Sequence, residues 1–337
     1  MRPELDNIRG VTRHIVLCAV LGACGFGPGA RATTDGAVSD AVTDGPGGGS
    51  DGGSDDGSSG AMGCFPQWLD HTVSISPSTV DEISELSSAG NDRNPWLSDN
   101  GLRMYFSREP GDANTSDIYF TARASIAQPF VTPTAYTNLN STAREGRAFV
   151  TSDELTLVLS TNRDGPLNIY MNTRVAPAVF GTPDGTYMTM VNSVGTQRND
   201  PSISADRLRL YLAADNGPAG KLQLLIATRS SVTENFSAPS VIPGTVDNAN
   251  HQGDPTLYSG ERLLVFSSFP LVVGNADVWY ATRASATESF GPPVRIPAVN
   301  TGAVEFDPVL SADGCEVYFA STRRGGAFHL FHAQVTK

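Results

Sequence analysis

The hydrophobic and polar positions of this chain repeat with a fixed period over its C-terminal part. Short apolar segments that contain a proline recur, for example residues 200–204 (DPSIS) and 307–311 (DPVLS). These anchor segments are centred on positions 95, 148, 201, 255 and 308, which lie 53, 53, 54 and 53 residues apart; the second copy has alanine instead of proline. A constant period of this length indicates a repeat architecture.

Each repeat predicts four short strands. The anchor segment is the first, a turn rich in Asn, Asp and Gly follows, and the second strand is apolar, as in residues 102–106. The third strand, residues 117–123 in the first copy, ends on an arginine, and a phenylalanine then opens a proline-rich fourth strand. We expect the arginines to make structural contacts between strands or blades. The arginines are Arg123, Arg174, Arg229 and Arg283, and the phenylalanines are Phe130, Phe180, Phe236 and Phe290; the last copy has Thr336 in place of arginine.

Four short strands per repeat without a helical pattern predict an all-β fold, a five-bladed β-propeller of four-stranded blades. The fifth copy stops after its third strand, and residues 80–87, before the first copy, supply the missing one. Leu86 lies nine residues before Pro95, as Val299 lies nine before Pro308. This N-terminal strand would close the ring and leave no exposed sheet edge. Six blades are the alternative, but they would need about fifty more residues.

The repeats also resemble a known family. Residues 307–314 (DPVLSADG) followed by 317–323 (VYFASTR), and residues 200–206 (DPSISAD), resemble the propeller repeats of the TolB-like group. The resemblance spans roughly residues 80–334 and implies the fold. The group ranges from translocation-system proteins to peptidase-associated propellers, so the resemblance implies no single function. Its members usually have six blades, and TolB carries a second domain, so no Tol-system role follows.

The positions just before each anchor carry the main candidate chemistry. The first strand of a blade is innermost in a propeller, so these residues face the channel or its mouth. Such a ring could bind a cation, a sugar or a basic peptide segment. Alternatively, its members cap turns and bind backbone amides of neighbouring blades, which we favour because the feature recurs in nearly every blade. The candidates are Asp92, Glu145, Arg147, Arg198, Asp200, Asp254, Glu305 and Asp307.

A carbohydrate-active hydrolase is the competing function. Paired carboxylates can act as acid and base, and some five-bladed propellers that resemble this one in blade number are glycosidases. The carboxylates available for this role include Asp92, Glu145, Asp254 and Glu305. The sequence has no nucleophile elbow, phosphate loop or His-Glu-x-x-His stretch, so we assign no catalytic residue. Of the five histidines, only His251 lies near the predicted channel mouth.

The cysteines and histidines predict no cofactor. No Cys-x-x-Cys pair or Cys/His cluster has metal-ligand spacing, although a channel-bound cation such as calcium stays open as an alternative. Cys64 and Cys315 would remain after export, and an oxidising compartment would permit a disulfide. Cys315 nevertheless occupies a position that is leucine in three other repeats, which favours a buried, unbonded thiol.

The N-terminus predicts export and lipid anchoring. Residues 1–23 read as a signal peptide, in which three arginines precede the apolar run 15–21, too short to span a bilayer. Residues 21–24 (LGAC) resemble the bacterial lipobox, which implies that Cys24 becomes the lipidated N-terminus. Because Gly25 rather than aspartate follows it, the same resemblance implies sorting to the outer membrane.

The remaining composition defines the domains and the class of partner. Residues 24–63 form a Gly/Ser/Asp-rich segment without apolar periodicity, which predicts a disordered tether, and residues 64–337 form the propeller. The net charge of -12 argues against nucleic acid. We therefore predict a cell-envelope lipoprotein, facing the periplasm or the cell surface, that contacts the membrane through its lipid alone. Its expected function is non-enzymatic binding or scaffolding of an envelope protein or glycan.

Overall fold

The computed structural model describes residues 63–110, 115–176, 179–244, 249–271 and 275–336. These residues belong to one compact unit, Gly63–Lys337. The predicted signal peptide, the predicted lipidation site Cys24 and all but the last residue of the predicted tether lie outside them. No helix among the described residues has the length and apolar character needed to cross a membrane.

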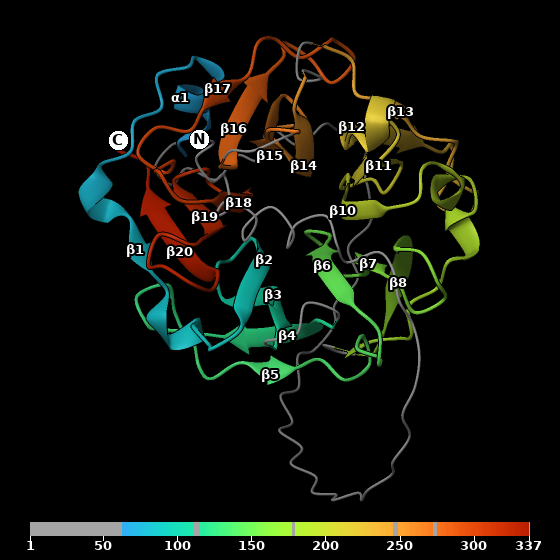
Figure 1. Ribbon diagram of the computed structural model, residues 1–337, viewed down its shortest axis with the longest axis horizontal. Coiled ribbons are helices and arrows are strands. Elements are labelled where there is room, and N and C mark those ends of the chain that lie inside the picture. The colour runs from blue at the N-terminus through green and yellow to red at the C-terminus, as the bar shows by residue number, and fades with distance from the viewer. Residues whose placement is uncertain (1–62, 111–114, 177–178, 245–248, 272–274, 337) are drawn as a thin grey trace, which may run out of the picture. The chain divides into compact units, whose positions relative to one another are not determined.

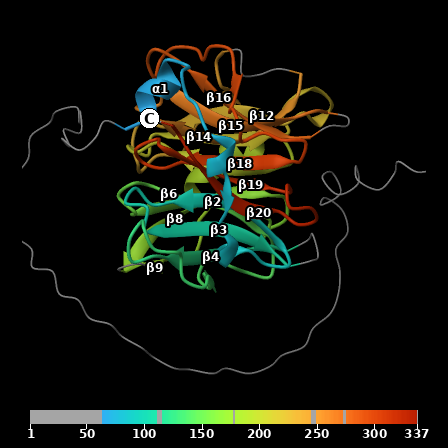
Figure 2. The same ribbon diagram turned by 90° about the vertical axis from the view of Figure 1, so that its left-hand side faces the viewer.

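Five four-stranded antiparallel sheets surround a common centre, so the predicted five-bladed propeller is confirmed (Figure 1). We number the blades in chain order and give the strands of each from the inside outwards. Blade 1 has β2 (Asn91–Leu97), β3 (Arg103–Glu109), β4 (Asp117–Ala122) and β5 (Thr134–Ala135); blade 2 has β6 (Glu145–Val150), β7 (Thr156–Thr161), β8 (Asn168–Ala176) and β9 (Val179–Phe180); blade 3 has β10 (Arg198–Ile203), β11 (Arg209–Ala214), β12 (Gln223–Thr228) and β13 (Ser240–Val241); blade 4 has β14 (His251–Tyr258), β15 (Leu263–Phe269), β16 (Asp277–Thr282) and β17 (Val294–Arg295); and blade 5 has β18 (Glu305–Leu310), β19 (Glu316–Ser321), β20 (His329–Gln334) and β1 (Asp81–Glu82). Figure 2 shows the ring from its side, with the strands of blades 1 and 5 towards the viewer.

The N-terminal segment closes the ring, as its spacing predicts. Strand β1 pairs antiparallel with β20, with Asp81 opposite His332. The strand has only two residues instead of the predicted 80–87, because a 3-10 helix at Ser84–Leu86 follows it. Other short helices in the described chain are α1 (Phe65–Leu69) and the 3-10 turns Pro77–Thr79, Thr186–Met188, Val191–Ser193 and Pro218–Gly220.

The outermost strands of blades 1 to 4 are shorter and differently placed than predicted. Each has two residues, and three of them begin four residues after the phenylalanine that was expected to open them. A proline directly precedes these three strands, and proline has no amide hydrogen to donate to a sheet ladder. Only Phe180 lies within its strand, β9. The three phenylalanines are Phe130, Phe236 and Phe290, and the three prolines are Pro133, Pro239 and Pro293.

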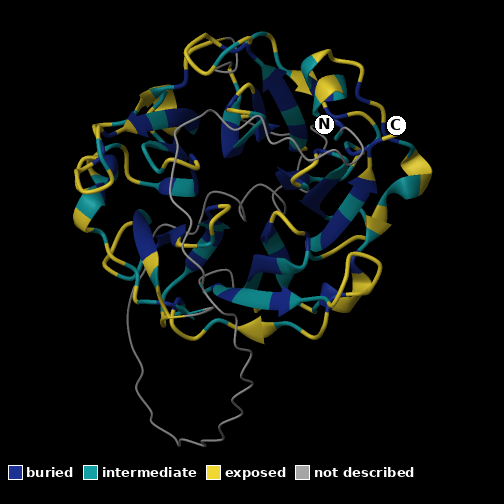
Figure 3. Cartoon of the chain, turned by 180° about the vertical axis from the view of Figure 1, so that it is seen from behind, coloured by how far each residue is buried: buried dark blue, intermediate teal, exposed yellow. Residues whose placement is uncertain are grey.

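The core lies between successive blades. We call each contact between neighbouring blades a seam and name it by their numbers. In seam 1–2, Tyr105 of β3 packs with Leu157 and Leu159 of β7, and in seam 3–4, Tyr211 of β11 packs with Phe266 of β15. Figure 3 shows buried residues along the strands of each blade and exposed residues mainly in the connecting loops. Each sheet is thus covered on both faces, which explains the apolar second strands.

The arginine that ends the third strand has the expected structural role. In blade 1, Arg123 donates from Nε to the carbonyl of Gly101 (2.7 Å) and its guanidinium lies 4.5 Å from the Phe130 ring centroid. Arg229 and Arg283 donate to the equivalent turn carbonyls and stack on the equivalent rings. Each contact joins the inner hairpin to the outer edge of its own blade and covers an apolar ring with a cation.

Blade 5 lacks this arginine, and the N-terminal helix supplies the missing donor. Trp68 of α1 donates from Nε1 to the carbonyl of Gly314 (2.8 Å), the turn position that corresponds to Gly101. Its ring lies edge-on to Tyr280 of β16, 5.1 Å between centroids, and both views place α1 beside β16 (Figures 1 and 2). The helix therefore completes a blade that its own sequence leaves incomplete.

The same helix carries a disulfide that the sequence did not favour. Cys64 and Cys315 are bonded across a sequence separation of 251, so the expectation of a free thiol at Cys315 is wrong. The Cys64 amide donates to the carbonyl of Asp313 (2.7 Å), which places the helix start on the blade 5 turn. A repeat alignment could not detect this contact because residues 64–69 belong to no repeat.

Candidate functional site

Each inner strand contains an irregularity at its anchor. The register of all five inner hairpins shifts there, for example between Arg93 and Trp96 in β2. In four blades the residue before the proline has a left-handed backbone, with φ between 54° and 61°. Asparagine and aspartate adopt this conformation more readily than other non-glycine residues. These four residues are Asn94, Asp200, Asp254 and Asp307.

The bulges bring together a buried group of charged and polar side chains, which we call the central cluster: Arg93, Asn94, Arg147, Asp200, Asp254 and Asp307. Asp307 of blade 5 accepts hydrogen bonds from blade 1, from Arg93 Nε (3.1 Å) and Nη2 (3.2 Å) and from the Asn94 amide (3.1 Å) and Nδ2 (2.9 Å). Asp254 Oδ2 accepts from the Asp307 amide (3.3 Å). The inner strands of blades 1, 4 and 5 are thus joined directly.

Arg147 extends the cluster across the ring. It comes from blade 2, yet its Nη1 lies 3.7 Å from Asp254 Oδ1 of blade 4, and its Nη2 donates to Thr256 of the same blade. Arg147 is 1% exposed, and Asp254 and Asp307 are 2% and 0% exposed. The cluster therefore fills the middle of the ring with side chains rather than leaving carboxylates free along an open channel.

Burial and mutual repulsion favour the protonated form of one carboxyl of the cluster. Desolvation, followed by the charges of Asp307 and Asp200, raises the pKa of Asp254 well above its ordinary value. The charge of Arg93, followed by hydrogen bonding with Asp254, lowers the pKa of Asp307. Burial also raises the pKa of Asp200. With one proton held, the charges of three acids and two arginines balance.

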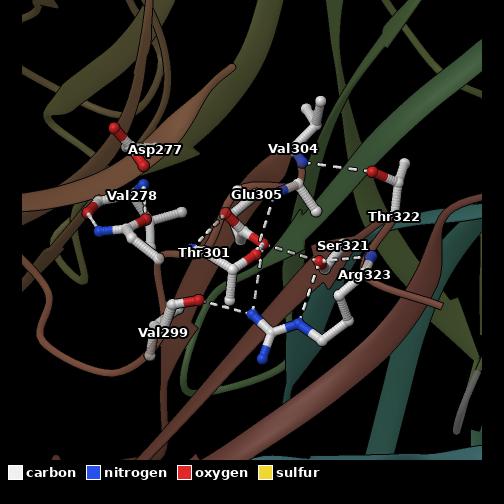
Figure 4. A network of polar contacts seen from close by, with 12 residues as sticks. Asp277, Val278, Val299, Thr301, Val304, Glu305, Ser321, Thr322 and Arg323 are labelled. Carbon is white, nitrogen blue, oxygen red and sulfur yellow. Dashed lines mark hydrogen bonds and ion pairs between the residues drawn. The ribbon is translucent and has the colours of Figure 1, made fainter. Parts of the chain in front are cut away.

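The other four candidates lie within the blades. The Glu305 carboxylate accepts from the Thr301 amide (3.0 Å) and hydroxyl (2.6 Å), from Ser321 Oγ (3.0 Å) and from Arg323 Nη2 (3.4 Å), as Figure 4 shows. Glu145 makes the corresponding four contacts in blade 2. Both carboxylates are fully buried and bind the incoming loop to the first and second strands of their blade.

Asp92 and Arg198 occupy the same position in blades 1 and 3. Asp92 accepts from the Ser88 amide (2.9 Å) and from Arg108 Nε (2.6 Å). Arg198 donates to the carbonyls of Val194 (3.1 Å) and Gly195 (2.6 Å) in the preceding loop. The eight predicted residues are therefore divided between two places. Arg147, Asp200, Asp254 and Asp307 meet in the central cluster, whereas Asp92, Glu145, Arg198 and Glu305 hold loops, and a ligand-binding ring of all eight stays a prediction.

An arc of aromatic side chains beside the cluster escaped the sequence analysis. His251 stacks on Phe269 (4.9 Å), Phe269 meets Phe306 edge-on (5.3 Å), and Phe306 lies 6.0 Å from Phe328. Arg93 lies over both Phe306 and Phe328, at 4.8 Å and 4.9 Å. Phe306 is buried and the other three rings are half-buried. The sequence feature that could have revealed this arc is Phe306, which lies two positions before its proline. The other repeats have Arg93, Gly146, Asn199 and Gly253 at this position.

His251 is uncharged in this arc. Its Nδ1 accepts a hydrogen bond from the Leu222 amide (3.0 Å). Burial, followed by the charge of Lys221, lowers the pKa of His251 below its ordinary value. A neutral ring flanked by phenylalanines presents a mostly apolar face, of the kind that stacks on sugars or on apolar side chains of a partner.

The carboxyl groups of the cluster are engaged in internal contacts. The two carboxyl groups of a glycosidase acid–base pair stand about 5–9.5 Å apart so that substrate and water fit between them. Here Asp254 accepts from the Asp307 amide, Asp307 accepts four hydrogen bonds from blade 1, and both are buried. Among the residues that the structure describes, no group of three or more His, Cys, Asp or Glu is arranged to hold a metal ion. The central cluster is thus arranged for internal bonding.

Comparisons with known proteins support the fold alone. No protein-family model and no curated protein matches the sequence. A GH43_1 enzyme from Xanthomonas citri superimposes with a TM-score of 0.55 and 13% identity, over 80% of this chain and 93% of that one. The α-L-arabinofuranosidase from Podospora anserina, solved with cellotriose, gives 0.52 and 13%, over 74% and 91%. TolB from Acinetobacter baumannii gives 0.46 and 14%, over 75% of this chain and 56% of that chain.

Proposed function

We propose that this chain is a non-catalytic binding module of the cell envelope that engages a protein or glycan at the aromatic side of its channel. The observation that carries the proposal is the internal bonding of the central cluster. Asp307 already accepts four hydrogen bonds from Arg93 and Asn94, and Asp254, whose pKa burial raises, accepts from the Asp307 amide. Carboxylates in this state contribute rigidity rather than acid–base chemistry.

The aromatic arc supplies the binding surface in this proposal. Phe269 and Phe328 are half-buried, so each keeps part of its ring accessible while its remaining surface is packed. Rings fixed in this way lose little conformational entropy when a ligand stacks on them. Arg93 adds a cation that is 22% exposed and is held in place by Asp307. A fixed aromatic and cationic surface suits reversible binding of a sugar or a peptide segment.

The location of this module follows from the N-terminal sequence. We infer that residues 1–23 direct export, that Cys24 carries the lipid and that residues 24–63 tether the propeller to the outer membrane. The disulfide between Cys64 and Cys315 supports export, because such bonds persist in oxidising compartments. The membrane contact would then be the lipid alone.

The proposal is tested with the full chain by measuring binding and turnover in the same samples. Immobilised protein is exposed to envelope proteins and to soluble wall and capsule polysaccharides, and retained material is sized. We expect a ligand to be retained at unchanged length, and to be lost when Phe269 and Phe328 are both changed to serine. Ile126→Ser is the matched control, because it removes an exposed apolar side chain (72%) outside the arc.

A different result would replace the binding module by a hydrolase. If a polysaccharide is shortened, and Asp254→Asn abolishes the shortening while circular dichroism and the melting temperature are retained, the carboxylates are catalytic and the proposal is wrong. Equal retention by the wild type and the Phe269/Phe328 variant would instead remove the arc as the binding surface.

A further inference from the structure

The seams repeat one arrangement of charge on the side of the ring where the inner hairpins turn. In seam 1–2 the carboxylate of Glu154, from the turn of blade 2, accepts from Arg174 Nη2 (2.9 Å) and from Arg103 of blade 1. In seam 3–4, Glu261 accepts from Arg209 Nε (2.7 Å) and lies 3.5 Å from Arg283 Nη2. In both seams, one carboxylate lies between two guanidinium groups.

Seam 2–3 keeps one of the two cations of this arrangement and has a second arginine in place of the carboxylate. Arg207 occupies the turn position of Glu154 and Glu261, and Arg229 is the arginine that ends the third strand. Thr156 stands where the other two seams have an arginine, and its hydroxyl lies 3.5 Å from Arg207 Nη1. Two arginines therefore meet at this seam.

Neither arginine has an acidic partner among the residues that the structure describes. Arg207 Nε is buried and makes no hydrogen bond there. Arg229 donates to two carbonyls, of Arg207 (2.8 Å) and of Glu234 (3.4 Å), and it is 8% exposed. Burial, followed by the charge of Arg207, lowers the pKa of Arg229. Asp153 is the nearby acid, and its Oδ1 accepts from the Thr151 hydroxyl and the Leu155 amide of its own turn. These hydrogen bonds, followed by the charge of Arg207, lower the pKa of Asp153, although no ion pair joins the two described side chains.

The backbone adds an independent observation. Arg207 has a φ of 60°, a left-handed conformation that costs a residue with a Cβ about 1 kcal/mol relative to glycine. Blades 1 and 5 have Gly101 and Gly314 at this turn position. Glu154 and Glu261 share this conformation and make ion pairs, whereas Arg207 has the same conformation without an ion pair in the described chain.

We propose that seam 2–3 binds a carboxylate group carried by an external ligand, held between Arg207 and Arg229. A planar guanidinium donates two parallel hydrogen bonds to a carboxylate, and two such groups provide the charge that Glu154 and Glu261 receive in their seams. The site lies on the turn side of blades 2 and 3 and is distinct from the aromatic arc. It therefore holds whether or not the proposed channel-mouth function is correct.

The test titrates the full chain with single-carboxylate probes at constant ionic strength. N-acetylglutamate α-amide represents an acidic peptide side chain, glucuronate represents an acidic sugar, and N-acetylglutamine α-amide is the uncharged control. The readout is the NMR signals of the arginine Nε–H groups. We expect saturable shifts of the Arg207 and Arg229 signals with at least one carboxylate and none with N-acetylglutamine α-amide. The probe that binds more tightly shows whether a peptide or a sugar carries the carboxylate that the site prefers.

Two variants make the result specific. Arg207→Glu gives seam 2–3 the charge pattern of its neighbours, so the internal carboxylate should occupy the site and abolish saturation. Arg207→Gln removes one charged donor and should weaken binding by about tenfold. Arg262→Glu is the matched control, because it makes the same charge change at an exposed arginine in the blade 4 turn and should leave the response intact.

Three results would overturn the proposal. The first is the absence of saturable shifts with either carboxylate, and the second is an equal response to N-acetylglutamine α-amide. The third is an unchanged response in Arg207→Gln, which keeps the size of the side chain and tests the site even if Arg207→Glu fails to fold.

Discussion

Replacing Asp254 by asparagine should change how the stability of the propeller depends on pH. In the folded protein, burial and the charges of Asp307 and Asp200 raise the pKa of Asp254 well above its ordinary value. In the unfolded chain the same carboxyl titrates near 4. The bound proton therefore contributes stability that is full below the unfolded pKa and is lost as the pH rises through the folded pKa. Asparagine has the same shape and can donate to Asp307 at every pH.

The magnitude follows from proton linkage. Between the two pKa values, folded wild type binds one proton more at this site than the unfolded chain, so its free energy of unfolding falls by about 1.4 kcal/mol per pH unit. Asp254→Asn loses this dependence. Its stability relative to wild type should thus rise by about 1.4 kcal/mol per pH unit, or about 3 kcal/mol over two units within the window. Asp92, whose pKa is also raised, remains in both proteins and cancels, whereas Asp200 interacts with Asp254 and adds its own change to the difference.

The assay is chemical denaturation of both proteins at a series of pH values from 4 upwards, followed by intrinsic fluorescence. The difference between the two free energies of unfolding is plotted against pH. Parallel curves would show that Asp254 is ionised in the folded state and would refute the assignment of its proton. A difference that falls with pH would mean that the ionised carboxylate stabilises the fold, through Arg147, more than the neutral one does.

Three further changes test other contacts. Changing Cys64 and Cys315 to serine removes a crosslink over 251 residues and should cost up to roughly 5 kcal/mol in the chain-entropy model; an unchanged melting temperature with and without reductant would contradict this. Trp68→Phe removes the donor to the blade 5 turn and should destabilise by about 1–3 kcal/mol, whereas a neutral effect in thermal unfolding would show that the contact is dispensable. Arg323→Met leaves the fully buried Glu305 without its cation and should cost about 3–5 kcal/mol in urea unfolding; a loss below about 1 kcal/mol would indicate that Thr301 and Ser321 suffice.

The fold could be predicted from the sequence because a propeller repeats its constraints. A spacing of 53 or 54 residues gives the length of sequence that forms one blade. The nine-residue distance between Leu86 and Pro95 identifies the segment that closes the ring. Leu86 is fully buried in the structure, as Val299 is in blade 4. The structural role of the arginines that end the third strands was predictable for the same reason, since a residue that recurs from blade to blade is expected to stabilise the blade.

Features that do not repeat could not be predicted in this way. Trp68 and Cys64 precede the first repeat, so no alignment of blades shows that they complete blade 5. The aromatic arc depends on Phe306, at a position where no other blade has an aromatic residue. The central cluster was found only in part, because the bulge that brings Arg147 and Asp254 together is a backbone property that composition does not reveal.

The disulfide also determines how the propeller would bear a mechanical load. The outermost strand of blade 5 is short, because β1 pairs with β20 over only two residues. Tension applied through the chain before residue 63 would reach Cys64 before it reached β1, and would pass through the covalent bond to Cys315 at the start of β19. The segment between Cys64 and β1 would stay slack under that pull. A propeller attached to a surface through its N-terminal side could thus bear a pulling force while its ring stays closed.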